Sequence, residues 1–141
     1  MFTIPDSVRI IDVCAIAYSK CTEIIIPANV ISVTDKCFVY SIVTVIYFHG
    51  NTDILHNTFE TTDQLTDIYY FGTRQITLDS IFQSDRTTFP TIHTCKGYKG
   101  KFAGLDVVVS EKCASYPDIK PHTCFIKKET DSFKKLNIHF I

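Results

Sequence analysis

Apolar residues recur in this chain at a constant interval of 22 positions. Cys21 is followed 22 residues later by Val43, and Val43 in turn by Leu65. Two more sets share the interval and complete the spacing L-x-x-L-x-L in each repeat: Ile24, Ile46 and Ile68, and Ile26, Phe48 and Tyr70. Apolar side chains at one fixed interval predict a solenoid, in which successive turns bury the same positions against one another.

The pattern continues on both sides of these three repeats. Phe2 and Ile4 fit the last two positions of an earlier strand. After a two-residue insertion, Phe89, Ile92 and Thr94 keep the internal spacing, with a polar residue at the third position. A second group of apolar positions also recurs and predicts the opposite wall of the core: Val8 and Val30; Ile11, Val33 and Leu55; Ile16, Phe38 and, at an interval of 21, Phe59.

These patterns predict a β-rich, right-handed leucine-rich-repeat solenoid. We expect a parallel β-sheet on its concave face, short irregular or 3-10 return arms, and about four short repeats within residues 1–109. Residues 97–109 are expected to form a C-terminal cap, since their glycines allow tight turns. From Ser110 the repeat is absent, and residues 110–141 are predicted to be a tail, either packed on the solenoid as extra strands or loose.

Two segments resemble a known repeat family. Residues 4–8 (Ile-Pro-Asp-Ser-Val) and 26–30 (Ile-Pro-Ala-Asn-Val) look like BspA-type leucine-rich repeats, each with an Ile or Val three residues further on. The pairs Ala15-Ile16 and Cys37-Phe38 stand at the Ala-Phe place of that repeat. The resemblance covers roughly residues 2–109, although Cys21 stands where Leu is usual. It implies a right-handed solenoid, often with a surface-antigen or adhesion role, and no catalytic residues.

The outward-pointing positions between the ladder residues also align from one repeat to the next, and they form the candidate binding site. In a leucine-rich repeat these side chains point out of the concave face, the usual ligand surface of a solenoid. Tyr47 and Tyr69 are the predicted anchors, because tyrosine brings a large contact area and a hydroxyl to an interface. The alternative is that they are simply good strand residues. The partner-binding set also includes Ile25, His93, Glu23 and Asp67.

No pattern in the sequence predicts catalysis, a cofactor or a metal site. The five histidines lie in no recognisable nucleophile or acid–base motif, and no phosphate-binding loop is present. The pairs His93-x-Cys95 and His122-x-Cys124 lack the spacing typical of zinc ligands. We therefore expect a non-enzymatic protein with a protein partner.

Charge and hydropathy narrow the class of partner. Fourteen basic and fifteen acidic residues leave a net charge of -1, which provides no electrostatic attraction to nucleic acid or to an anionic membrane. The apolar runs are too short for a membrane-spanning helix, and the N-terminus does not resemble a signal peptide. As written, the chain is expected in the cytoplasm, or at the cell surface if it is a fragment.

The cysteines divide between the repeat and the rest of the chain. Cys21 and Cys37 take core positions and are predicted to be buried free thiols. Three cysteines lie outside the repeat, which leaves room for one simple bridge, and we expect it between Cys113 and Cys124 rather than at Cys95.

Both ends of the chain support alternative functions. The sequence opens within a strand, so an uncapped N-terminal end could self-associate or stack on another repeat array. Residues 135–140 (Lys-Leu-Asn-Ile-His-Phe) loosely resemble the basic-x-Val/Ile-x-Phe peptide that docks on protein phosphatase 1, although the Lys is one residue too far from the Ile. The alternatives to a binding module are thus an assembly fragment and a phosphatase-docking regulatory subunit.

Overall fold

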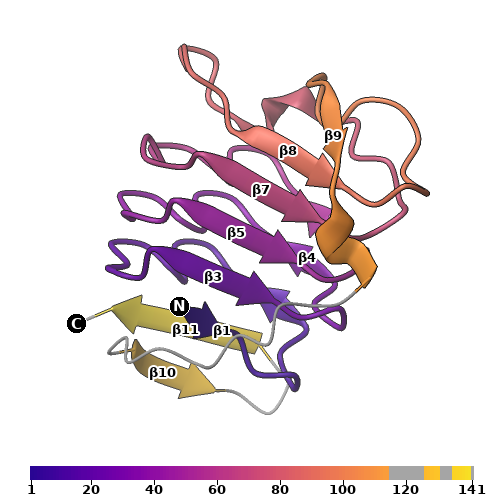
Figure 1. The fold of residues 1–141 in the computed structure, drawn as a ribbon. Coiled ribbons are helices and arrows are strands. Elements are labelled where there is room, and N and C mark those ends of the chain that lie inside the picture. The colour runs from indigo at the N-terminus through magenta and orange to yellow at the C-terminus, as the bar shows by residue number, and fades with distance from the viewer. Residues whose placement is uncertain (115–125, 131–134, 141) are drawn as a thin grey trace.

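The computed structural model describes residues 1–114, 126–130 and 135–140; for Ala114 and the last two segments it describes the backbone. The chain winds into a parallel β-solenoid, which confirms the fold class predicted from the 22-residue interval (Figure 1). The first sheet has the order β1-β3-β5-β7-β8-β9, and all its neighbours are parallel. Its strands are β1 (Phe2–Thr3), β3 (Glu23–Ile26), β5 (Val45–Phe48), β7 (Asp67–Tyr70), β8 (Thr91–Thr94) and β9 (Val107–Val109).

The register of the first sheet is the one that the repeat predicts. Ile24 pairs with Ile46, Ile46 with Ile68, and Ile68 with Ile92 across the two-residue insertion. The ladder side chains of β3, β5 and β7 point into the core, where each stacks on its counterpart in the next turn. In the sequence, parallel strands that bury one face in this way are recognised by Ile and Val at recurring positions.

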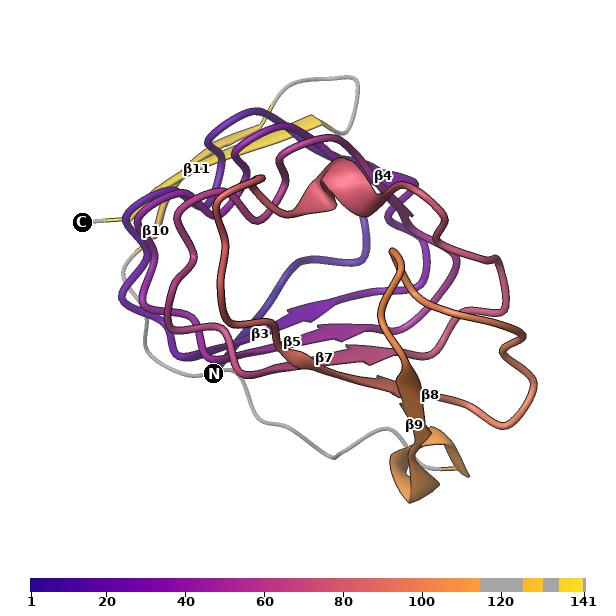
Figure 2. The ribbon, with the colours of Figure 1, turned by 90° about the horizontal axis from the view of Figure 1, so that it is seen from above.

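The return arms carry a second sheet on the opposite side of the core (Figure 2). Its order is β10-β11-β2-β4-β6, with β2 (Ile10–Ile11), β4 (Ser32–Val33), β6 (Asp53–Ile54), β10 (Ile126–Thr130) and β11 (Lys135–Phe140). The arms were predicted to be irregular or 3-10, yet short stretches of them pair in parallel. Turns of almost equal length bring the arms to strand spacing, so their backbone groups can pair from one turn to the next.

Two residues assigned to the core by spacing lie elsewhere. Leu55 was predicted to align with Val33, but Val33 pairs with Ile54, and Leu55 is 40% exposed. This arm is one residue shorter, and a shift of one residue turns a side chain from one face of a strand to the other. Phe89 was predicted as a ladder residue and is 49% exposed, while the next residue, Pro90, is buried. The Phe89 ring instead contacts the edge of Phe82, with centroids 5.5 Å apart.

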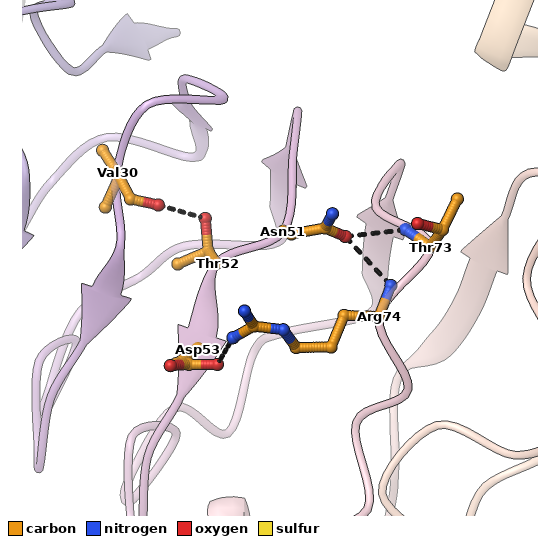
Figure 3. A network of polar contacts seen from close by, with 6 residues as sticks. All are labelled: Val30, Asn51, Thr52, Asp53, Thr73 and Arg74. Carbon is orange, nitrogen blue, oxygen red and sulfur yellow. Dashed lines mark hydrogen bonds and ion pairs between the residues drawn. The ribbon is translucent and has the colours of Figure 1, made fainter.

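Polar side chains tie successive turns together at the corner that follows β5 (Figure 3). The Asn51 side-chain oxygen accepts hydrogen bonds from the backbone N–H groups of Thr73 at 2.8 Å and Arg74 at 2.9 Å. The Thr52 hydroxyl donates to the Val30 carbonyl at 2.9 Å, and the Arg74 guanidinium pairs with Asp53. These bonds satisfy backbone groups that have no strand partner at a corner.

The described helices are two short 3-10 segments, η1 (Asp79–Ile81) and η2 (Glu111–Ala114). Within the described residues, no helix has the length and apolar character that crossing a bilayer requires.

Replacing Tyr70 by phenylalanine is expected to reduce the loss of stability at high pH. Tyr70 is fully buried, and its hydroxyl has no hydrogen-bond partner among the described residues. Burial, with a smaller contribution from Tyr98, raises the pKa of Tyr70 from 10.0 to about 12. The unfolded chain therefore ionises first, so the stabilising contribution is complete below pH 10 and is lost as the pH rises toward 12.

Urea unfolding at pH 8 and pH 11 measures this effect. Between the two pH values, we expect the free energy of unfolding to fall by about 1 kcal/mol less in Tyr70→Phe than in the unmodified protein. Tyr18→Phe is the matched control, because Tyr18 is exposed. An equal loss in all three proteins would contradict the prediction.

Candidate functional site

The outward side of the first sheet brings together the side chains predicted to bind a partner. Ile25, Tyr47, Tyr69 and His93 are direct neighbours in register on β3, β5, β7 and β8. The ring centroids of Tyr47 and Tyr69 are 4.8 Å apart and those of Tyr69 and His93 4.2 Å apart, with nearly parallel planes. We call Tyr47, Tyr69 and His93 the aromatic column. It exists because the repeat places a ring at the same strand position in three consecutive turns.

An acidic side chain supports one end of the aromatic column. Asp67 lies beside Tyr69 in β7, and its Oδ1 atom is 2.7 Å from Nε2 of His93. The Thr66 hydroxyl donates to the other carboxylate oxygen of Asp67 at 2.8 Å. Glu23 occupies the position equivalent to Asp67 two strands away, since both pair with Val45. The predicted residues therefore form one surface that combines rings with carboxylates.

Exposure divides the predicted set into buried and accessible members. Ile25 and Tyr47 are each only 4% exposed, although the sequence placed them in an outward-pointing column. Tyr69, His93, Glu23 and Asp67 are partly exposed. Tyr69 is therefore the accessible tyrosine of the column, and the buried Tyr47 ring stacks against it from the neighbouring strand.

Lys112 is part of this surface and was not predicted. It belongs to η2, which lies against the outward side of the sheet (Figure 2). Its ammonium nitrogen is 4.5 Å from the ring centroid of Tyr69 and 5.6 Å from that of Tyr47, so one cation contacts both tyrosines. Lys112 lies outside the 22-residue repeat, and its place depends on the path of the chain after β9. No local sequence signal reports that path.

Tyr47 and Lys112 both have shifted pKa values. Burial raises the pKa of Tyr47, while the Lys112 charge opposes that rise. Partial burial lowers the pKa of Lys112, but the neighbouring Tyr69 and Tyr47 side chains outweigh it, and the net shift is upward. Both shifts keep Tyr47 neutral and Lys112 charged at neutral pH.

A disulfide fixes the segment that carries Lys112. Cys113 is bonded to Cys95, which follows β8, and their Cα atoms are 5.5 Å apart. This corrects the predicted bridge between Cys113 and Cys124, because the chain after β9 returns to the end of β8. Cys124 lies outside the described residues.

The structure confirms one of the two predicted free thiols in the repeat. Cys21 was predicted to be a free thiol but is disulfide-bonded. Cys37 is free and buried as predicted, and burial raises its thiol pKa.

Among residues 1–113, no group of three His, Cys, Asp or Glu side chains is placed to hold a metal ion. His122, part of the second possible zinc pair, lies outside the described residues.

Two further surface features compete with the aromatic column as binding sites. Tyr18 and Tyr40 stack at a corner of the solenoid with ring centroids 5.3 Å apart, and they are 64% and 57% exposed. The two tyrosines are 22 residues apart, so the repeat interval is the sequence signal for this pair. A pocket of about 610 Å³ near η1 is lined by His56 and Asp79 and by the Phe82 ring, among others.

The ends of the solenoid bear on the alternative functions. β11 pairs with β10 on one edge and with β2 on the other, so residues 135–140 would have to leave the sheet before docking as a strand elsewhere. Figure 1 shows β11 at the N-terminal end of the solenoid, near β1. Ile4 is buried and Phe2 partly buried. The apolar surface expected at an open N-terminal end is therefore largely covered.

Comparison of the chain with protein-family models, with curated proteins and with solved structures found no match.

Proposed function

We propose that this protein is a non-enzymatic binding module that holds a protein partner on the outward side of its first sheet. The observation that supports this most is the aromatic column, in which Tyr69 and His93 remain partly exposed beside Asp67. The surface has a rigid base, because the side chains below it are buried in the solenoid core. Rigid aromatic side chains lose little entropy when they bind, which favours them as interface anchors.

The composition of the surface favours a polypeptide partner. Aromatic rings are enriched at the centres of protein interfaces, and polar groups around them give specificity. Solenoids present such positions as an extended array on one face. A BspA-type repeat and a surface or adhesion role remain part of this proposal, supported by the two matching segments, residues 4–8 and 26–30.

The compartment also remains a proposal. Disulfides form mainly in oxidising environments, so the Cys95–Cys113 bond favours such a compartment over the cytoplasm predicted from the sequence. Titration of free thiols in protein taken from its native cell would decide this, since complete reaction without reductant would contradict an oxidised state.

A displayed random-peptide library, panned on the purified protein, tests the binding function. Selected peptides are expected to lose at least about fivefold in affinity for Tyr69→Ser, because truncation of an interface anchor costs more than about 1 kcal/mol. Tyr69 is only partly buried, so the circular dichroism spectrum should stay unchanged. Tyr47→Ser is a poorer test, because Tyr47 is buried and its loss would disturb packing.

Tyr18→Ser is the matched control, since it removes an exposed, stacked tyrosine from the other aromatic pair. Affinity that is retained in Tyr69→Ser and lost in Tyr18→Ser would move the site to the corner. A library that yields no specific binder to the folded protein would count against the proposed function itself.

A further inference from the structure

Lys112 already occupies the candidate binding surface as an internal ligand. Its ammonium group lies within 5.6 Å of two tyrosine ring centroids. Yet the residue as a whole is exposed, as is its neighbour Glu111. Its segment is held by the Cys95–Cys113 disulfide, by a hydrogen bond from the Ser110 N–H to the Thr94 carbonyl at 2.8 Å, and by one from the Lys112 N–H to the Ser110 hydroxyl at 3.1 Å.

We propose that the aromatic column, with Asp67 at its side, is a binding site for a lysine side chain of a partner peptide, and that Lys112 occupies this site until the partner displaces it. The inference rests on the proposed function and adds the chemistry of the partner. In this arrangement the protein supplies both the site and a competitor for it.

The chemistry of the surface supports an ammonium ligand. Tyrosine rings attract a cation through their electron-rich faces, and their hydroxyls can accept a hydrogen bond from it. The carboxylates of Glu23 and Asp67 lie two residues before the column position in β3 and β7, so they add negative charge along one side of the column. A cation is therefore favoured here, and the contact between Lys112 and both tyrosines shows that an ammonium group fits.

The same geometry makes Lys112 displaceable. A cation–aromatic contact at an exposed site is worth about 0.5–1 kcal/mol, which a second lysine at sufficient concentration can match. The disulfide holds Cys113, but the long Lys112 side chain has rotatable bonds of its own and can swing into solvent. Displacement therefore requires no unfolding of the solenoid.

Competition can be measured with two matched peptides. One is acetyl-(Gly-Ser-Lys)₃-amide, and the other carries norleucine in place of each lysine, which keeps the alkyl stem and removes the ammonium. Both are titrated into the unmodified protein, into Lys112→Gln and into Lys96→Gln, with the ring-proton shifts of Tyr69 as the readout. Lys96→Gln is the charge-matched control, because Lys96 is exposed and also lies beside a cysteine of the disulfide.

We expect the lysine peptide to bind Lys112→Gln two- to fivefold more tightly than the unmodified protein, the factor that corresponds to about 0.5–1 kcal/mol. Lys96→Gln should leave its affinity unchanged, and the norleucine peptide should not shift the Tyr69 ring in any of the proteins. Equal gains for both peptides on Lys112→Gln would overturn the ammonium preference, while the proposed binding function would stand. If the lysine peptide bound Lys112→Gln no more tightly than the unmodified protein, the internal-ligand role of Lys112 would be overturned. The library test would still decide the proposed function separately.

Discussion

Phe59→Ala is expected to lower the free energy of unfolding by about 4 kcal/mol. Phe59 is fully buried, and its ring stacks on Phe38 at 5.8 Å and on Phe82 at 5.4 Å between centroids. It also meets the edge of Phe48 at 6.4 Å. One substitution therefore opens a cavity that removes contacts to the turns on both sides. Because each turn of a solenoid is stabilised mainly by its neighbours, such a cavity in the middle of the stack weakens the whole array.

Chemical denaturation followed by circular dichroism measures this loss. Phe89→Ala is the control, since Phe89 is the phenylalanine of this region that lies outside the core cluster and is half exposed. We expect it to cost less than about 1.5 kcal/mol, chiefly from the edge contact with Phe82. Similar losses in the two variants would mean that the Phe38–Phe59–Phe82 stack is not a principal part of the core.

Gly72→Ala is expected to cost about 2–3 kcal/mol, the second-largest effect that we predict. A Cβ atom at Gly72 would lie 2.6 Å from the Asn51 side-chain oxygen and 2.7 Å from both the Gly50 carbonyl oxygen and the Tyr70 hydroxyl oxygen. Asn51 is held by its two backbone donors (Figure 3). Tyr70 is fully buried, so neither side chain can move away easily. The added methyl group must therefore push apart the corner that joins two turns.

Gly97→Ala is the matched control, because a Cβ atom at Gly97 would meet nothing closer than a Thr73 methyl carbon at 4.0 Å. Thermal unfolding of the two variants should show a clear fall in the midpoint for Gly72→Ala and little change for Gly97→Ala. A Gly72→Ala protein as stable as the unmodified one would show that successive turns are less tightly packed at this corner than the structure places them.

The binding proposal depends on a part of the chain that lies outside the repeat. Lys112 lies beyond β9, the last strand of the first sheet. Its ammonium lies against Tyr69 and Tyr47, and Tyr69 remains partly exposed. The segment that follows β9 therefore adds a cation to the candidate binding surface.

The sequence alone determined the solenoid, the register of its first sheet and the shared face of the six candidate residues. It could do so because a solenoid repeats one local environment: the same spacing buries Ile24, Ile46 and Ile68 and aligns Tyr47 with Tyr69. A constant interval therefore contains most of the information about which residues become neighbours. It predicts less well where the interval changes, as it does at Leu55 and Phe89.

The tertiary structure alone decided the exposure of the tyrosines, the disulfide partners and the presence of Lys112 on the candidate binding surface. These depend on contacts between segments that share no period, such as Cys113 with Cys95 and Lys112 with Tyr69. Contacts of that kind follow from the path of the whole chain, because a loop can close on many partners at similar entropic cost. The repeat therefore predicts the shape of the surface, and the chain beyond it decides what that surface can bind.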